Sequence, residues 1–338
     1  MTIIASTKRP RVELPMPYGW FQVLYSQQLS VGQSLPLEYF GQELVIFRTE
    51  AGEAKVLDAY CPHMGAHLGY GIRDQAGGGS RVVGDSIVCP FHGWQFNGDG
   101  QCTGIPYAER MPPRVAKCEQ VIPSWQVREQ NQCIYVWYHP EGIEPLFEPP
   151  QIDEAMPDTD DWGELKIYEW DIATHPQEIG ENAVDAAHFR FVHGTPEVPE
   201  PTVMRFEEHC RFGLLETEME TPKGRIEGRI ENSSIGPGIS TVRFSGICET
   251  VLMANLTPID AHNTKAMYAF IQRDGNGQKV GRVGQAIIDD IRQQMEEDRI
   301  IWARKRYLEK PMLCDGDGPF AKFRRWYGQF LVAETRDD

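Results

Sequence analysis

This sequence of 338 residues contains no apolar run close to the roughly 18 residues that a membrane-spanning helix requires. Its first ten residues carry charges and lack the apolar stretch of a secretory signal, so we expect a cytoplasmic protein that does not bind membranes. No Gly-x-Gly-x-x-Gly motif follows a predicted strand, which argues against a flavin or nicotinamide site on this chain. Basic residues are few, 33 against 49 acidic ones, and the net charge of −16 argues against a nucleic-acid partner.

The chain has 8 cysteines, and the six other than Cys61 and Cys89 lack the spacing of a disulfide framework, so we expect a reducing compartment. Four residues nevertheless stand out as two cysteine-histidine pairs. Cys61-Pro62-His63 is followed, after a gap of 25 residues, by Cys89-Pro90-Phe91-His92. Two thiolates and two imidazoles at this spacing are the ligand set of a Rieske [2Fe-2S] cluster, with the cysteines on one iron and the histidines on the other. The pairs predict an electron-transfer centre.

Two other interpretations of these pairs are open. A structural zinc ion also takes two cysteines and two histidines, and a disulfide could join Cys61 to Cys89. Small zinc modules usually carry the second ligand pair on a helix. Here Val82–Val88 and Trp94–Phe96 flank the second pair, and a Gly98-Asp99-Gly100 turn follows, which predicts strands and hairpin loops. Ligand loops at hairpin tips favour the [2Fe-2S] cluster.

The chain divides into two parts near residue 145. Before that point, short apolar runs alternate with turn signals, which predicts a small all-β domain. Its clearest strand candidates are Leu44–Phe47, Val56–Leu57 and Ile134–Tyr138, and Gly77–Gly79 is predicted as a loop tip. Prolines crowd the stretch from His139 to Pro157, which excludes a helix or a central strand and indicates a linker. We predict a tail over residues 1–16, one domain over 17–145 and a second over 146–338.

The second part contains both strand and helix patterns, which predicts an α+β fold with an antiparallel sheet. The predicted elements are a strand at Tyr168–Ile172, a helix from about Pro176 to Val192, strands between Phe206 and Ile271, a helix from about Val283 to Leu308, and a tail ending in Phe320–Leu331. Some apolar residues of the sheet could line a pocket for a polycyclic or aromatic molecule with few polar groups. The candidates are Ile226, Ile230, Phe244, Ile247, Val251, Leu252, Met253, Met267 and Phe270.

A second group of metal-ligating residues lies in this part. Asp185 and His188 are three residues apart, hence on one face of the predicted helix, and His193 follows before Gly194 ends it. Two histidines need a carboxylate to complete the facial triad of non-haem iron(II), which leaves coordination positions open for oxygen. Hydrogen-bonded histidines at a helix end are the alternative, but Asn182 and Asp185 on the same face favour a metal site.

The missing carboxylate is predicted on the late helix. Ile291, Met295 and Trp302 recur at helical spacing, and Asp298 lies on the same apolar stripe. A carboxylate is costly to bury there unless it binds a cation or meets an arginine, so we predict that Asp298 is the third iron ligand. Four acidic residues on the other faces are interpreted as solvated charge: Asp289, Asp290, Glu296 and Glu297. Glu297 and Asp290 are the alternative ligands.

Together these residues make the chain resemble the oxygenase component of the Rieske non-haem iron oxygenases over nearly its whole length. The motifs are the run from Cys61 to Gly69, the run from Cys89 to Trp94, and the spacing of Asp185, His188 and His193. The resemblance implies a Rieske β domain followed by a helix-grip catalytic domain. It also implies a ring-shaped homotrimer in which the cluster of one subunit faces the mononuclear iron of its neighbour.

The resemblance implies roles and partners as well. Asp185 would bridge a cluster histidine of one subunit, His92 rather than His63, to an iron-ligating histidine of the next. An acid favoured by a helix dipole is the alternative for Asp185. Asn182 is a further catalytic candidate. A separate NAD(P)H-dependent reductase would supply electrons, directly or through a ferredoxin, and O2 would be consumed.

Within the family, the chain is most similar to the 3-ketosteroid 9α-hydroxylases and cholesterol 7-desaturases. The residues behind this assignment are Asp58-Ala59-Tyr60, Glu297-Asp298, Asp315-Gly316-Asp317-Gly318-Pro319, Arg325-Trp326-Tyr327 and Gln329-Phe330. They imply a monooxygenase that hydroxylates an apolar polycyclic substrate, a steroid or sterol.

Two features depart from the expected pattern. The gap between His63 and Cys89 is longer than the family's usual gap, and Pro196, Pro199 and Pro201 differ from the ketosteroid enzymes. Two alternatives therefore stay open. One is a Rieske oxygenase for an aromatic or other small molecule, acting by hydroxylation, demethylation or desaturation. The other is a Rieske electron carrier without oxygenase activity.

Overall fold

The computed structural model describes residues 11–71, 79–156, 159, 161–199, 201–221, 224–246, 248–273 and 281–332, without the side chains of 217–226. Several predictions fall outside the described residues: the first ten residues of the tail, the loop tip at Gly77 and Gly78, Pro157 of the linker, Ile247, and the Ile226 side chain. Within the described chain, no helix is long and apolar enough to cross a membrane.

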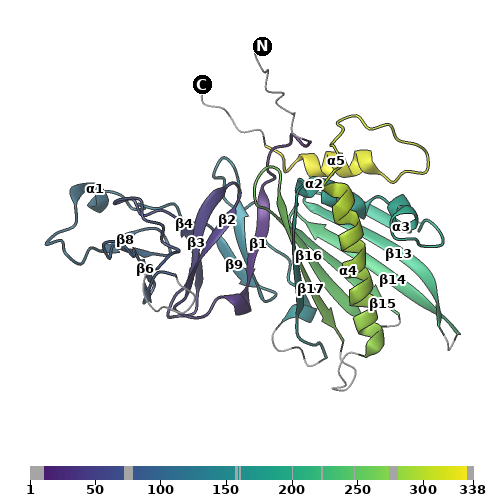
Figure 1. The fold of residues 1–338 in the computed structure, drawn as a ribbon, viewed down its shortest axis with the longest axis horizontal. Coiled ribbons are helices and arrows are strands. Elements are labelled where there is room, and N and C mark those ends of the chain that lie inside the picture. The colour runs from purple at the N-terminus through teal and green to yellow at the C-terminus, as the bar shows by residue number, and fades with distance from the viewer. Residues whose placement is uncertain are drawn as a thin grey trace, which may run out of the picture.

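The N-terminal half consists of short antiparallel strands, as its alternating apolar runs predicted (Figure 1). Three small sheets result. They are β1 (Gly19–Tyr25), β10 (Cys133–Tyr138) and β9 (Val127–Gln130); β2 (Ser34–Tyr39), β3 (Gln42–Arg48) and β4 (Ala54–Asp58); and β5 (Val82–Val83), β6 (Ser86–Val88), β7 (Gln95–Asn97) and β8 (Cys102–Gly104). Two short helical turns, η1 (Ser26–Gln28) and α1 (Pro113–Ala116), join them. The sheet β5 to β8 forms one end of the molecule.

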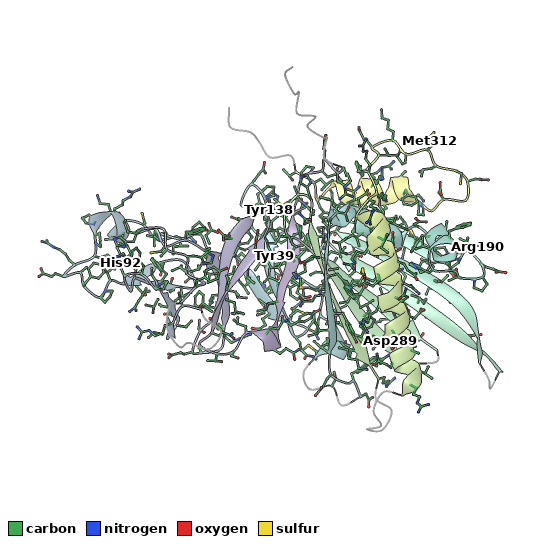
Figure 2. The ribbon with its side chains drawn as sticks, in the orientation of Figure 1. Tyr39, His92, Tyr138, Arg190, Asp289 and Met312 are labelled. Carbon is green, nitrogen blue, oxygen red and sulfur yellow. The ribbon has the colours of Figure 1, made fainter. Side chains whose placement is uncertain are left out.

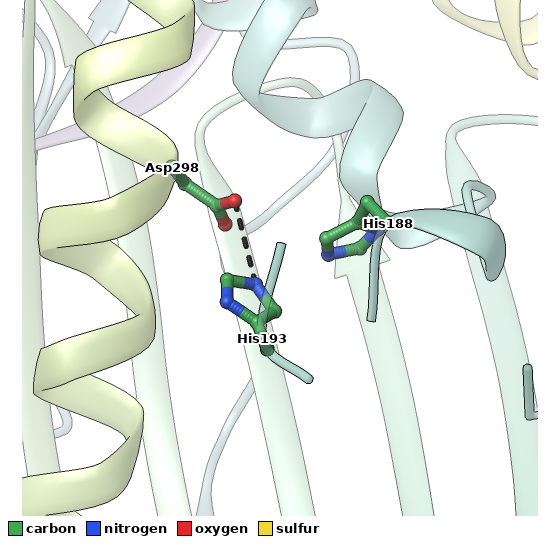
Figure 3. A group of neighbouring side chains, drawn as sticks. All are labelled: His188, His193 and Asp298. Carbon is green, nitrogen blue, oxygen red and sulfur yellow. Dashed lines mark ion pairs between the residues drawn. The ribbon is translucent and has the colours of Figure 1, made fainter. Parts of the chain in front are cut away.

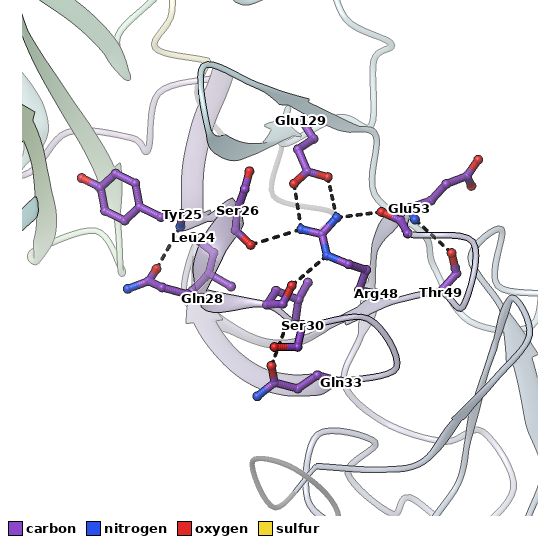
Figure 4. Close-up of polar contacts among 12 residues, drawn as sticks. Leu24, Tyr25, Ser26, Gln28, Ser30, Gln33, Arg48, Thr49, Glu53 and Glu129 are labelled. Atoms are coloured by element: carbon purple, nitrogen blue, oxygen red, sulfur yellow. Dashed lines mark hydrogen bonds and ion pairs between the residues drawn. The ribbon is translucent and has the colours of Figure 1, made fainter. Parts of the chain in front are cut away.

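Arg48, at the end of β3, joins two of these sheets through a buried network (Figure 4). Its guanidinium donates to both carboxylate oxygens of Glu129 on β9, at 2.7 and 2.8 Å, and to the carbonyls of Leu29, Gly52 and Ser26. Arg48 is only 8% exposed. Burial alone would raise the pKa of Glu129, but the hydrogen bonds from Arg48 outweigh it and hold that pKa below 4.5.

Replacing Glu129 with glutamine should lower the free energy of unfolding by about 2 kcal/mol at neutral pH, because a buried guanidinium loses its counter-charge. Glu148→Gln is the matched control, since Glu148 forms the same two-pronged pair with Arg128 in an exposed position. It should change that free energy by less than about 1 kcal/mol. Urea unfolding measures both, and equal losses would contradict the prediction.

The same pair predicts the effect of pH on stability. The pKa of Glu129 is lower in the folded than in the unfolded chain. Its stabilisation is therefore complete above the unfolded pKa and is lost as the pH falls through the folded pKa. We expect the stability difference between the parent protein and Glu129→Gln to shrink as the pH is lowered below about 4.

The C-terminal half is built on a seven-stranded antiparallel sheet, so the α+β prediction is confirmed. The strand order is β11 (Lys166–Ile172), β17 (Thr264–Gln272), β16 (Thr250–Pro258), β15 (Ile239–Ser245), β14 (Gly224–Ile235), β13 (Cys210–Thr221) and β12 (Val203–Glu207). The helix α4 (Arg282–Trp302) crosses one face of the sheet, and α5 (Phe320–Gly328) lies at one end (Figure 1). The linker holds one helical turn, η2 (Asp153–Ala155).

The two faces of this sheet pack against different partners. One face buries Met253 and Met267 in a core that also contains Trp20 of the N-terminal half. The other face packs Phe270 against Ile288 of α4. Because both halves of the chain contribute to the first core, the boundary near residue 145 stays a prediction.

The prediction of one helix from Pro176 to Val192 is wrong. The segment forms α2 (Pro176–Gly180), η3 (Glu181–Ala183) and α3 (Ala187–Phe191), with a break at Val184–Ala186. The amides of Val184 and Asp185 bond to carbonyls only three residues back, at 3.0 and 3.3 Å, which tightens and ends the first turns. Val184 is buried in the core that also contains Trp20 and Met253. Residue spacing cannot reveal such packing between distant segments. Asp185 consequently precedes the helix that carries His188.

The second helix also ends earlier than predicted, at Trp302 rather than Leu308. Arg11 from the opposite end of the chain donates to the carbonyls of Trp302 and Lys305, both at 3.2 Å. The amide of Tyr307 bonds to the Arg11 carbonyl at 2.9 Å. These contacts satisfy carbonyls that a longer helix would have bonded internally, so the chain turns away.

Candidate metal centres

The two cysteine-histidine pairs lie on two similar loops at the remote end of the N-terminal half. Cys61 follows β4 and Cys89 follows β6, and both are almost fully buried. In each loop the cysteine carbonyl accepts a hydrogen bond from a glycine amide four residues on, Gly65 at 2.9 Å and Gly93 at 3.0 Å. Both glycines have positive φ, 72° and 76°, which the tight turn requires. No helix carries the second pair, unlike in the zinc interpretation.

The four side chains converge with the chemistry that a [2Fe-2S] cluster needs. All eight cysteines are free, so the Cys61–Cys89 disulfide is excluded. A hydrogen bond between these two thiols lowers the pKa of Cys89 to about 6 and, with burial, raises that of Cys61. The rings of His63 and His92 lie edge to face with centroids 4.8 Å apart. Their Nδ1 atoms are buried without a hydrogen-bond partner. Buried unpaired nitrogens of this kind fit metal ligation.

A second cluster brings together the predicted iron ligands (Figure 3). His188 lies on α3, His193 two residues beyond it, and Asp298 on the buried stripe of α4. One potential ligand atom from each lies within 4.8 Å of the other two. Three side chains at this separation could hold a single metal ion.

Hydrogen bonds select which nitrogen each histidine presents to this cluster. His188 Nδ1 donates a hydrogen bond to the Asp185 carbonyl, so the lone pair of the neutral ring is on Nε2. His193 Nδ1 donates to Glu297 Oε2 at 2.8 Å, and its Nε2 lies 3.4 Å from Asp298 Oδ1. Asn182 Nδ2 donates to Asp298 Oδ2 at 2.8 Å and lies 3.4 Å from His188 Nε2. Two imidazole nitrogens and one carboxylate therefore converge.

The electrostatics of the three side chains fit a cation site. Asp298 is 9% exposed, and burial raises its pKa to about 6. Burial also lowers the pKa of His188, which favours the neutral imidazole that binds metals. A buried carboxylate beside two neutral imidazoles is stabilised by a divalent cation, and this donor set fits iron(II) with open positions.

Asp185 lies at the edge of the cluster, with its side chain 30% exposed. Its Oδ1 accepts a hydrogen bond from the amide of His188 at 3.3 Å and lies 3.9 Å from His188 Nδ1. Within one chain the two centres are far apart: His92 and Arg190, which is on α3, lie at opposite ends of the long axis (Figure 2). The Asp185 side chain is therefore partly accessible to solvent.

Glu297 was predicted as solvated charge, and this is wrong because it binds His193. Glu296 is also not simply solvated, since it accepts from Trp170 Nε1 at 2.7 Å and pairs with Arg299. Asp289 and Asp290 are exposed, as predicted. The sequence carried one usable signal for Glu297: it borders the buried face of α4 next to Asp298.

Replacing Glu297 with alanine should raise the dissociation constant of the mononuclear site for iron(II) about tenfold or more, because His193 loses its orienting acceptor. The carboxylate also holds the proton on Nδ1, and the bond from His193 lowers the pKa of Glu297 accordingly. Glu296→Ala is the control, since its carboxylate contacts no histidine. Anaerobic iron(II) titration should leave that variant at the parent value, and equal effects would rule out the assigned contact.

Comparisons with known proteins agree with this geometry. Residues 19–125 match the Rieske [2Fe-2S] domain, and residues 136–331 match the 3-ketosteroid 9alpha-hydroxylase C-terminal domain. The chain is a Rieske non-haem iron oxygenase. A cholesterol 7-desaturase of Xenopus laevis is 33% identical over 96% of this chain and 74% of that protein. An oxygenase component of 3-ketosteroid-9-alpha-monooxygenase from Rhodococcus rhodochrous is 31% identical over 93% of this chain and 80% of its own length.

Solved structures support the fold of this Rieske oxygenase. The crystal structure of dicamba monooxygenase superposes on this structure with a TM-score of 0.71. The superposition covers 94% of this chain and 98% of the dicamba monooxygenase chain, at 15% sequence identity. At that identity the likeness concerns the fold alone. The predicted order of a Rieske domain followed by a domain with an antiparallel sheet is confirmed.

Proposed function

We propose that this chain is the oxygenase component of a monooxygenase that hydroxylates an apolar polycyclic substrate, a steroid or a sterol, in the cytoplasm. The observation that carries the proposal is the convergence of His188, His193 and Asp298 on a chain that also holds the two Rieske loops. The steroid names of the relatives and of the matching C-terminal domain support the substrate class.

The residues divide the chemistry between two centres. When bound, a [2Fe-2S] cluster held by Cys61, His63, Cys89 and His92 would supply single electrons, and iron(II) held by His188, His193 and Asp298 would supply oxygen activation. The protein groups prepare the second site. Asn182 orients the Asp298 carboxylate by donating to it, and Glu297 orients the His193 ring. Both contacts keep nitrogen and oxygen lone pairs aimed at one point.

The sheet face beneath α4 supports an apolar substrate. Gln272 on this face donates to the Gly284 carbonyl of α4 at 2.8 Å. The register places Thr250, Phe244, Ile230 and Leu215 in the same row across the sheet. Phe244, Ile230 and Leu215 are only half-buried although they lie on the α4 side. Apolar side chains left partly open on the face that carries α4 suit a hydrocarbon substrate.

The same arrangement supports a homotrimer with electron transfer between subunits. The two centres lie at opposite ends of one chain, so a neighbouring subunit is the natural source of electrons for the iron. Large apolar side chains are exposed at both ends. Met64, Phe91 and Tyr107 surround the cluster loops, and Phe191 is 80% exposed three residues after His188. Such patches mark protein–protein contacts. Asp185 would be the bridge between the subunits.

A separate NAD(P)H-dependent reductase, acting directly or through a ferredoxin, completes the proposed system. The relative from Rhodococcus rhodochrous is named as an oxygenase component, which supports a reductase partner. The acidic balance of the chain, −16 overall, would favour a basic surface on that partner.

One experiment tests the proposal as a whole. Anaerobically purified protein should contain iron and acid-labile sulfide in a ratio of about three to two and show Rieske visible absorption. With a reductase, a panel of steroids and sterols should produce oxygen uptake coupled to a hydroxylated product. Zinc without sulfide would contradict the assignment of the centres, whereas uncoupled oxygen uptake with every steroid would contradict the substrate class alone.

A further inference from the structure

The sequence motif Asp315-Gly316-Asp317-Gly318-Pro319 forms a loop between α4 and α5 that the proposed chemistry leaves unexplained. The loop is held by its own hydrogen bonds. The Cys314 amide donates to Asp317 Oδ2 at 2.7 Å, and the Phe320 amide donates to the Gly318 carbonyl at 2.8 Å. These bonds hold Gly318 against another part of the chain.

Gly318 contacts the backbone at the break between η3 and α3. A Cβ atom at position 318 would lie 1.6 Å from the Val184 carbonyl oxygen and 3.7 Å from the Asp185 amide. Gly318 does not have a positive φ of the kind that favours glycine, so space and not conformation demands it. Gly316 differs, because the nearest atom to a Cβ there would be Cys314 Sγ at 3.8 Å, an ordinary contact.

The contacted residues lead directly into the iron site. Val184 precedes Asp185, whose carbonyl contacts His188 Nδ1 and whose side chain accepts from the His188 amide. A displacement of Val184 therefore moves the proposed electron bridge and rotates an iron-ligating imidazole. At this break, the amides of Val184 and Asp185 bond only to carbonyls three residues back. These two bonds resist a displacement less than a continuous helix would.

Ion pairs clamp the same C-terminal segment onto α2 and η3. Glu178 and Glu181 are buried, with 0% and 2% exposure. Arg324 of α5 donates to both oxygens of Glu181, at 2.6 and 3.2 Å. Lys305 lies 3.2 Å from Glu178 and 3.5 Å from Glu181. Lys305 precedes the glycine loop and Arg324 follows it. Their ion pairs with the two buried glutamates therefore hold the loop at a fixed distance from Val184.

We propose that the segment from Lys305 to Arg324 is a brace that positions Asp185 and His188, with Gly318 as the point of contact. The inference rests on the proposed function for the role of Asp185, but the placement of His188 does not depend on that role. Gly318 acts as a positioning residue, because it touches neither metal nor substrate.

Gly318→Ala tests the brace, with Gly316→Ala as the control from the same loop. An added methyl must push the loop and Val184 apart by about 1 Å or more, a shift that can cost one to two orders of magnitude in rate. We expect about tenfold or more slower cluster reoxidation in a single turnover with oxygen and substrate. The iron(II) dissociation constant should rise about tenfold. The cluster absorption should stay close to that of the parent, and Gly316→Ala should match the parent in every measurement.

The outcomes separate this inference from the proposed function. Parent-like values for Gly318→Ala, or equal defects in both glycine variants, would overturn the brace. If Gly318→Ala does not retain the cluster, Arg324→Lys decides, since it keeps the charge but loses the two-pronged bond to Glu181. Slower reoxidation with an intact cluster then supports the brace, and an unchanged rate overturns it. If the Asp185→Asn variant has the parent turnover rate, the bridge role of Asp185 is contradicted. The iron(II) dissociation constant of Gly318→Ala still tests the brace in that case.

Discussion

Replacement of Asp298 by alanine should abolish substrate hydroxylation while the visible spectrum of the cluster stays that of the parent protein. The change removes the only carboxylate among the three converging ligand atoms. It also leaves Asn182 Nδ2 without its acceptor and His193 Nε2 without the negative charge 3.4 Å away. Two imidazoles alone bind iron(II) weakly, and loss of the metal removes several kcal/mol of stabilisation of the reaction. Turnover should fall by at least about a thousandfold.

Metal analysis distinguishes this effect from general damage. Iron content should fall by about one third while acid-labile sulfide stays constant, because the cluster loops lie at the other end of the chain. Asp290→Ala is the control on the same helix, since Asp290 is exposed and accepts a hydrogen bond from Gln294. Activity close to that of the parent is expected for this variant. Loss of the cluster in Asp298→Ala would show that this aspartate supports folding rather than iron binding.

Asp185→Asn should leave both metal centres loaded and still stall the enzyme. The asparagine side chain can accept from the His188 amide as the aspartate does at 3.3 Å, so the local structure is retained. It lacks the negative charge that would link a cluster histidine of the neighbouring subunit to His188. If Asp185 carries electrons between the centres as proposed, steady-state turnover should drop by about a hundredfold or more.

Single-turnover kinetics locate the step that fails. Cluster reduction by a chemical reductant should proceed at the parent rate, whereas reoxidation with substrate and oxygen should be slow. Asp171→Asn, an exposed aspartate of β11 that pairs with Lys265, serves as the control and should behave as the parent. Full activity of Asp185→Asn would remove the proposed conduit and leave Asp185 as a cap for the first turn of α3.

Local patterns were sufficient where the chemistry or the periodicity is short-range. The Cys61 and Cys89 pairs are recognisable because ligands of one cluster come from short loops with fixed spacing. Asp298 could be placed on a buried face because helical periodicity indicates burial, and in the structure Asp298 is 9% exposed on the same stripe of α4 as Met295 and Trp302. The strands of the N-terminal half follow from alternation in the same way.

Spacing failed where contacts between distant segments override local preference. The helix predicted over Pro176 to Val192 breaks at Val184, which is buried in a core built from both halves of the chain. The late helix ends at Trp302 because the Arg11 side chain donates a hydrogen bond to the Trp302 carbonyl. Glu297 looked like a solvated acid because nothing in its own helix shows that His193, more than a hundred positions earlier, lies beside it.

The amino-acid sequence by itself determined the Rieske family, the antiparallel architecture and the candidate ligands of both centres, because these depend on side-chain chemistry and on periods of two and 3.6 residues. Only the tertiary structure decided which nitrogen each histidine presents, how Asn182 and Glu297 orient the triad, and how Gly318 meets Val184. The physical reason is that hydrogen bonds and close backbone contacts between remote segments form only when the whole fold brings those segments together.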